Sequence, residues 1–239
     1  SLGSWSEGKH AGTSGIASSF SFYFSHHITT MEGGGVATDD HALADDLRSM
    51  RSHGWSRDRS DVSTWNAQVS SNDSKFLFVS TGYNVRPMEI QAAIGSLQIV
   101  EIDNFVSKRR AIAHRVCQAL SGTQLSVIGE NAFQNTESTK TNSWMLIPIQ
   151  VKGPNFAERK RHILEKLASL EIETRPVLTG NFLSQPAIQR ITRHAVDPNS
   201  FKVAAEITES TFLVGAHHDL SEEQITFLCN SLRDASSIQ

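Results

Sequence analysis

Apolar and polar positions alternate, or recur with helical spacing, along most of the chain. An aromatic-rich alternation predicts a strand over 20–24, and a second short strand at 36–38 follows three consecutive glycines. Apolar residues three or four positions apart predict a helix through 43–50, which Asp39 or Asp40 can cap. The chain is therefore expected to begin with two strands and a helix.

A polar stretch and a long helical stretch follow. Residues 56–75 are rich in Ser and Asp, which predicts a loop, and so long a loop is usually functional or mobile. Pro87 stands where a helix can start, and the apolar positions of 90–97 form one stripe along that helix. Helical character continues to about Leu120, with an interruption near Asp103.

Strands and helices also alternate in the C-terminal part of the chain. The predicted elements are strands at 145–151, 172–175 and 212–214, a helix over 156–170, and a last helix through 225–232 with a capping box of Ser221 and Gln224. Interleaved strands and helices indicate the α/β class.

Composition and charge exclude several classes of protein. The 239 residues are 38% apolar and 20% charged, which is typical of a globular protein and excludes disordered and fibrous classes. A net charge of −3 without a long basic run argues against nucleic acid as the main partner. Cys117 and Cys229 are too few for a disulfide framework, so we expect reduced packing residues. No apolar run is long enough to span a bilayer and no signal peptide opens the chain, so a cytoplasmic protein is expected.

The densest polar cluster, residues 25–34, follows the first predicted strand. Side chains just past a strand end usually face a cleft in an open α/β sheet. Adjacent side chains on an extended segment point to opposite faces, so one of His26 and His27 can be functional while the other packs. A pair of ordinary surface or core histidines is the more common case, and the residues alone favour it. A metal site is disfavoured there, because no carboxylate or Cys stands at ligand spacing.

Two further clusters contain polar residues that can bind an anionic ligand. Asn84 precedes a predicted helix start, where it can contact an anion or serve as a turn residue. Arg175 can clamp a carboxylate or a phosphate, or pair with Glu173 at the surface. His217 and His218, near the C-terminus, are expected to be structural.

Four motifs together resemble the DegT/DnrJ/EryC1/StrS family of sugar aminotransferases and dehydratases. They are SLGS…GK…GTSG at the start, SFSFYFSHHITTMEGG, GYNVRPMEIQAAIG and IETRPVLTGNFLSQPA, and together they run along the chain. The resemblance implies the aspartate-aminotransferase (type I) fold and a pyridoxal phosphate cofactor.

One position departs from the aminotransferase pattern. In the family, the strand before the ITTxEGG motif normally delivers a lysine that forms a Schiff base with the cofactor, and here that position is His26. No lysine lies between Lys9 and Lys75. Histidine at this position resembles the nucleotide-sugar 3-dehydratase branch, and two distant cysteines cannot hold the iron–sulfur cluster that some of its members carry.

The resemblance implies a reaction as well. Pyridoxamine phosphate would condense with the C4 ketone of a nucleotide-linked sugar, His26 would move the proton, the C3 hydroxyl would leave, and glutamate would regenerate the amine. Plain 4-amino transfer, or a non-catalytic pseudo-enzyme, remain as alternatives.

Other roles follow by position from the same resemblance. It implies that Ser21 binds the cofactor phosphate of its own subunit. It also implies that Asn84 reaches the cofactor phosphate of a neighbouring subunit, which requires a homodimer. It assigns contacts with the substrate or glutamate to five further residues: Ser25, His53, Arg57, Glu173 and Arg175.

The resemblance also implies a division into two parts. Residues 1–105 would be a remnant of the cofactor-binding large domain and 106–239 the small C-terminal domain, with a composition break near Asn104. The family's N-terminal portion would precede Ser1, including an Asp that pairs with the pyridine nitrogen, so we expect a fragment of a longer protein.

Overall fold

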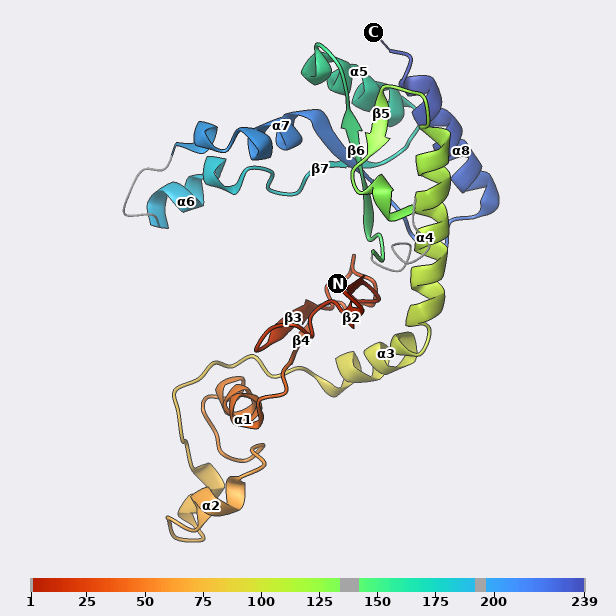
Figure 1. The fold of residues 1–239 in the computed structure, drawn as a ribbon. Helices are drawn as coiled ribbons and strands as arrows, with labels where there is room; N and C mark the ends of the chain where they lie inside the picture. Colours follow the sequence, from red (N-terminus) through yellow and green to blue (C-terminus); the bar gives the residue numbers. More distant parts are fainter. Residues whose placement is uncertain (1, 134–141, 192–196, 239) are drawn as a thin grey trace. The chain divides into compact units, whose positions relative to one another are not determined.

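The computed structural model describes residues 2–133, 142–191 and 197–238. It divides into two compact units, Ser1–Asp103 and Asn104–Gln239. Figure 1 shows the elements of both units, which are described separately below. The assignment of the two parts to the large and small domains of the family stays a prediction.

The first unit combines two small antiparallel sheets with short helices. Its elements are β1 (Trp5–Ser6), β2 (Lys9–His10), β3 (Ser18–Ser21), β4 (Gly34–Ala37), α1 (His41–Met50), α2 (Val62–Asn66), the 3₁₀ helix η1 (Asp73–Phe76) and α3 (Glu89–Ile99). Strand β1 pairs with β2, and β3 pairs with β4. Helix α1 is capped by Asp40, whose carboxylate accepts from two backbone N–H groups of the first turn, so this predicted cap is confirmed.

Several predictions for this unit need correction. The strand predicted at 20–24 ends at Ser21, because the chain turns immediately afterwards. The loop predicted at 56–75 contains α2 and the first residues of η1. Pro87 does not start α3, which begins at Glu89 after the N-cap Met88.

The apolar stripe predicted on α3 does not pack within the described residues. Ile90 and Leu97 are 58% and 77% exposed, and no residue of α3 is buried. Ile28 is the one apolar side chain that is buried among the described residues of this unit. The first unit therefore has almost no apolar core of its own, and its stability depends on polar contacts and on whatever covers its surface.

A buried carboxylate fastens the polar loop to α1. Asp45 accepts hydrogen bonds from the backbone N–H and the hydroxyl of Ser60, at 2.8 and 2.5 Å, and pairs with Arg48 at 2.8 Å. These contacts, those from Ser60 first, lower the pKa of Asp45 to about 2. Arg59, nearly buried, bridges Asp46 and Asp61. This network holds residues 59–61, which follow Arg57 in the loop, against α1.

The second unit is an antiparallel sheet with helices. Its elements are α4 (Ile102–Ala119, which begins at the boundary), β5 (Leu125–Val127), the 3₁₀ helix η2 (Glu130–Phe133), β6 (Leu146–Val151), α5 (Phe156–Ser169), β7 (Thr174–Pro176), η4 (Phe182–Ser184), α6 (Pro186–Ile191), η5 (Pro198–Ser200), α7 (Lys202–Ser210), β8 (Thr211–Gly215) and α8 (Glu222–Ala235). The strand order is β5-β6-β8-β7, and each neighbouring pair is antiparallel.

This unit has a continuous apolar core. Burial alternates along β6, which turns Ile147, Ile149 and Val151 inward. They pack with buried residues of α4, α5 and α8, which Figure 1 shows beside the sheet. The predicted capping box of Ser221 with Gln224 is confirmed at the start of α8.

The state of the two cysteines and the length of the helices can be compared with the expectations from the sequence. Cys229 is buried and Cys117 is half-buried, and neither is in a disulfide. Burial raises the pKa of both thiols, as expected of packing residues. Among the described helices, none combines the length and apolarity needed to cross a membrane.

Candidate functional site

A tight turn, not an extended segment, carries the adjacent histidines. After β3, the backbone N–H of His26 donates to Tyr23 O at 3.0 Å, and the chain folds back so that Thr30 N–H donates to Phe22 O at 2.8 Å. The sequence-based argument that His26 and His27 face opposite sides of a strand is therefore wrong in its premise. Their burial still differs, because His27 is 7% exposed and His26 is half-buried.

The His26 imidazole has an unsatisfied nitrogen. Nδ1 is buried and has no hydrogen-bond partner among the described residues, and the ring lies edge-on to Tyr23 with centroids 6.1 Å apart. A buried polar atom without a partner costs roughly 1–3 kcal/mol, so such an atom usually points to a missing ligand, water or subunit. Ser21 and Ser25 lie in the same segment and are exposed. The Ser21 Oγ accepts from Tyr23 N–H at 3.3 Å, which leaves its hydroxyl hydrogen able to bond an anion.

A glutamine on α3 holds the segment that follows His26. The side chain of Gln98 accepts from Thr29 N–H at 2.9 Å and donates to Thr29 O at 2.6 Å. It thus pairs with both backbone groups of one residue, as a neighbouring strand would. Since backbone groups in a half-buried turn need partners, this contact stabilises the conformation that presents His26.

The same face of α3 makes two more contacts with this segment. Gln91, one heptad before Gln98, donates to Glu32 O at 2.6 Å. Gly95 lies between them, and a Cβ at Gly95 would come within 3.1 Å of the Thr30 methyl group, so the helix approaches closely. We call Gln91, Gly95 and Gln98 the glutamine clamp. The sequence analysis missed it, although the spacing of 91, 95 and 98 places all three on one helix face.

The clamp leads to a first prediction. Gln98→Ala leaves the N–H and C=O of Thr29 without partners, which costs about 1–2 kcal/mol for half-buried groups. We expect hydrogen exchange at the Thr29 amide to accelerate about 5–30-fold, measured by NMR on the intact protein. Gln68→Ala is the matched control, since among the described residues its side chain donates to Thr64 O, four positions earlier in the same segment. Unchanged exchange at Thr29 in Gln98→Ala would contradict the clamp.

A second group of predicted site residues lies where two loops pair. Segment 50–56 runs antiparallel to 77–85, with His53 N–H donating to Tyr83 O at 2.8 Å and a β-bridge between Ser52 and Asn84. His53 has a φ of +64°, in the left-handed region, and both His53 and Asn84 are exposed. The fold therefore brings His53 and Asn84 together, although 31 positions separate them.

Arg57 belongs to an exposed aromatic cluster. Its guanidinium lies 3.8 Å from the centroid of the Trp55 ring, a cation–π arrangement. Trp55 in turn stacks on Phe76 and Phe78, with centroids 5.5 and 6.2 Å apart. Phe76 and Phe78 are 69% and 53% exposed. This cluster orients Arg57 and offers an apolar surface around it.

Glu173 and Arg175 belong to the second unit and pair with each other. Two guanidinium nitrogens of Arg175 donate to the same carboxylate oxygen of Glu173, at 2.9 and 3.1 Å. Both side chains are exposed, so the surface ion pair left open by the sequence is present. Such pairs contribute about 0–1 kcal/mol, and a ligand carboxylate or phosphate could replace this one at little cost.

Comparison with known proteins identifies the family. The model of the DegT/DnrJ/EryC1/StrS aminotransferase family matches residues 1–233. A GDP-4-keto-6-deoxy-D-mannose 3-dehydratase of Yersinia pseudotuberculosis is 34% identical over 98% of this chain and 58% of its own length. One from Escherichia coli O55:H7 is 32% identical with the same coverage. The chain thus spans 58% of the length of these two relatives.

Solved structures of similar proteins support the same family and fold. The E. coli GDP-4-keto-6-deoxy-D-mannose-3-dehydratase with bound hydrated PLP has a TM-score of 0.82 at 32% identity, and the match covers 96% of this chain and 57% of that one. The aminotransferase PseC of Helicobacter pylori has a TM-score of 0.78 at 23% identity and supports the fold alone. These matches confirm the predicted α/β fold. The chain belongs to the DegT/DnrJ/EryC1/StrS aminotransferase family.

Proposed function

We propose that this chain is part of a pyridoxal phosphate-dependent nucleotide-sugar 3-dehydratase, with a GDP-linked 4-keto-6-deoxyhexose as substrate and glutamate as amino donor. The observation that carries the proposal is His26. It occupies the position that the family resemblance gives to the Schiff-base lysine, and no lysine lies between Lys9 and Lys75. Its buried Nδ1 has no partner among the described residues.

The names of similar proteins support the substrate and the cofactor. Two of them are GDP-4-keto-6-deoxymannose 3-dehydratases, and solved structures of that enzyme carry hydrated PLP, a trapped PLP-glutamate geminal diamine, or, in a variant, GDP-perosamine. A lipopolysaccharide biosynthesis protein of Salmonella typhimurium is 28% identical over 98% of this chain. These names favour a role in deoxysugar and O-antigen biosynthesis, and we propose that the protein acts in the cytoplasm.

The described residues fit the cofactor. The free hydroxyl hydrogen of Ser21 suits a phosphate oxygen, and the unpaired Nδ1 of His26 suits a polar group of the bound cofactor or substrate. When bound, the cofactor supplies an amine that reacts with the sugar ketone and a ring that accepts electrons. His26 then moves a proton: one imidazole nitrogen takes it, and the same ring delivers it to the departing C3 hydroxyl.

The remaining residues bind and orient. We assign Asn84 to the phosphate bound by a second copy of the chain, with His53 and Arg57 beside it at the substrate. Ser25 is assigned to the substrate. Glu173 and Arg175 are assigned to the substrate or glutamate, which requires their mutual ion pair to open. The assignment of His53 and Asn84 to one function is supported by the pairing of their loops.

A homodimer would also explain the surface of the first unit. Apolar side chains on α3 and on the loop with Asn84 are exposed, among them Leu97 at 77% and Tyr83 at 65%. Exposed apolar side chains that gather in one unit favour contact with another protein surface. Equilibrium sedimentation of the intact protein measures the dimer directly.

The decisive assay separates dehydration from amino transfer. The intact protein is incubated with pyridoxal phosphate, glutamate and GDP-4-keto-6-deoxymannose, and the product is analysed by mass spectrometry. We expect a product that has lost the C3 oxygen and retains the C4 ketone. A product with an amine at C4 and an intact C3 hydroxyl would show an aminotransferase, and no turnover with saturable cofactor binding would require a different substrate. Absence of cofactor binding would overturn the proposal.

A further inference from the structure

One histidine ring links the loop between β8 and α8 to the first turns of α4. The His218 ring stacks on Phe105 of α4, with centroids 3.9 Å apart and an angle of 21° between the ring planes. It also stacks on His217, with centroids 4.4 Å apart. The His218 side chain is 12% exposed, whereas that of His217 is 59% exposed. Of the two rings, that of His218 therefore packs against the helix.

A buried arginine holds the start of the same loop. Arg109 of α4 is 2% exposed, and its guanidinium donates to Ala216 O at 3.2 Å. Further along the loop, Leu220 N–H donates to His217 O at 3.2 Å and closes a turn around His218. Loss of the ring stack would therefore free residues 217–220, while Arg109 would still hold Ala216.

The surroundings of His218 suit a neutral ring and not a charged one. Its Nδ1 is buried and has no hydrogen-bond partner among the described residues, whereas its Nε2 lies 3.8 Å from an oxygen of Asp219. A neutral imidazole carries one proton, which can sit on Nε2 toward the carboxylate, but an imidazolium carries a proton on both nitrogens. Protonation would therefore bury an N–H group at Nδ1 without an acceptor, which is unfavourable.

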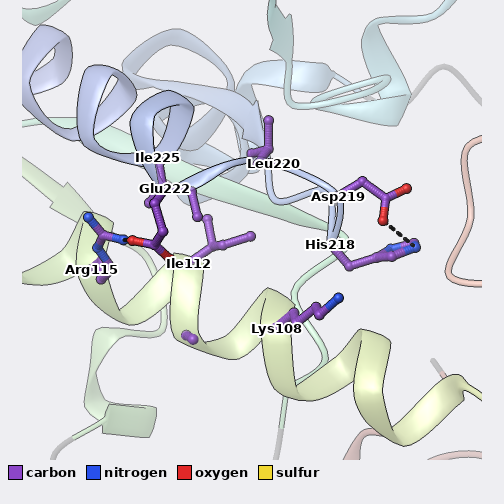
Figure 2. A pocket seen from close by; sticks show the side chains of 9 residues that line it. Lys108, Ile112, Arg115, His218, Asp219, Leu220, Glu222 and Ile225 are labelled. Carbon is purple, nitrogen blue, oxygen red and sulfur yellow. Dashed lines mark hydrogen bonds and ion pairs between the residues drawn. The ribbon is translucent and has the colours of Figure 1, made fainter.

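The charges that face His218 act in the same direction on balance. Lys108 and Arg109 of α4 repel a positive charge on the ring, and so does His217 when it is protonated. Asp219 is the carboxylate that favours the charged ring. Figure 2 shows Lys108 on α4, across from the loop that carries His218 and Asp219. Burial of the ring first, and these cations next, lower the pKa of His218 from its ordinary value.

Solvent reaches the ring through a cavity. His218 and Asp219 from the loop and Lys108 and Ile112 from α4 line a cavity of about 340 Å³, which Figure 2 shows from close by. Protons can therefore exchange between the ring and the solution, so the charge of His218 follows the pH of the medium.

We propose that His218 is an acid-sensitive latch, whose neutral ring holds residues 217–220 against α4 and whose protonated ring releases them. A histidine with a lowered pKa in the folded state stabilises that state fully above its pKa in the released loop. The stabilisation is lost as the pH falls, by about tenfold per pH unit, until the pH reaches the folded pKa. The latch is therefore closed at neutral and alkaline pH and opens in acid. This proposal does not rest on the proposed catalytic function.

The first test is amide hydrogen exchange of the intact protein, measured by NMR as a function of pH. Protection of the Leu220 amide, which donates to His217 O, is expressed relative to the intrinsic exchange rate at each pH. We expect this protection to fall by about tenfold per pH unit below about pH 6. His218→Phe keeps a ring that can stack on Phe105 but takes up no proton, so its protection should stay constant over the same pH range.

The second test changes the neighbouring charges one at a time. The titration midpoint of the His218 ring is read from its Cε1–H signal at low ionic strength. Lys108→Ala removes a repulsive charge and should raise the proton affinity roughly two- to fivefold, whereas Asp219→Asn removes an attractive charge and should lower it by a similar factor. Both side chains are exposed, so the variants should fold. Lys166→Ala changes an exposed lysine of α5, and as the matched control it should leave the midpoint unchanged.

Three results would overturn the proposal. The first is a His218 midpoint in the folded protein that equals or exceeds the midpoint in the urea-unfolded protein. The second is an acid-dependent loss of Leu220 protection that persists in His218→Phe. The third is a shift of the midpoint in the same direction in Lys108→Ala and Asp219→Asn. Thermal unfolding at pH 8 checks that each variant folds, and the two charge variants still test the latch if His218→Phe does not fold.

Discussion

Replacing His26 by asparagine is expected to lower the rate of sugar dehydration by about 10²–10⁴-fold, the usual contribution of general acid–base catalysis. Asparagine keeps much of the size and hydrogen bonding of histidine, but it cannot take up and release a proton near neutral pH. The effect should fall on the turnover number rather than on cofactor affinity.

Two comparisons make this result specific. His41→Ala changes an exposed histidine at the start of α1 in the same unit, and it should leave turnover unchanged. Cofactor binding, followed by absorbance, should persist in His26→Asn, since Ser21 and Asn84 are proposed to hold the phosphate. A His26→Asn protein that still dehydrates at a tenth or more of the wild-type rate would assign the proton transfer to another group.

Local sequence signals predicted the parts of the fold that local contacts determine. The Asp40 cap of α1 and the Ser221–Gln224 box of α8 involve residues two or three positions apart, so the pattern of side chains is sufficient. The strand predicted at 20–24 lies at Ser18–Ser21, so its predicted end is three residues too far along the chain, because a turn bond from His26 N–H to Tyr23 O overrides the alternation. Alternation describes side-chain polarity and says little about where a chain turns.

Contacts between distant residues could not be predicted in this way. The Gln98–Thr29 pair spans 69 positions, and periodicity cannot show which side chain meets which backbone. The apolar stripe of α3 is the pattern expected of a packed helix face, yet among the described residues the face that makes contacts is the one with Gln91, Gly95 and Gln98. His26 was found by resemblance to a family motif, since its neighbours alone favoured an ordinary structural histidine.

Replacing Gly54 by alanine is expected to destabilise the loop pair that holds His53 and Asn84 by about 4 kcal/mol or more. Gly54 has a φ of +89°, where a side chain costs about 1–2 kcal/mol. In addition, an added Cβ would lie 1.7 Å from Ser80 O, so the two loops would have to separate. Their separation would break the bonds from Val79 N–H to Gly54 O and from His53 N–H to Tyr83 O.

A second glycine isolates the steric part of this effect. Gly8 has a φ of +75°, and among the described residues no atom beyond its chain neighbours lies within 4 Å of an added Cβ, so Gly8→Ala should cost only the backbone strain of about 1–2 kcal/mol. Amide exchange of Val79 and His53 in the intact protein measures the difference, and about 4 kcal/mol corresponds to roughly 1,000-fold faster exchange. Equal effects of the two substitutions would show that the loops do not pack as described. If His53 and Asn84 act together on a ligand, Gly54→Ala should also weaken cofactor and substrate binding, whereas Gly8→Ala should leave both unchanged.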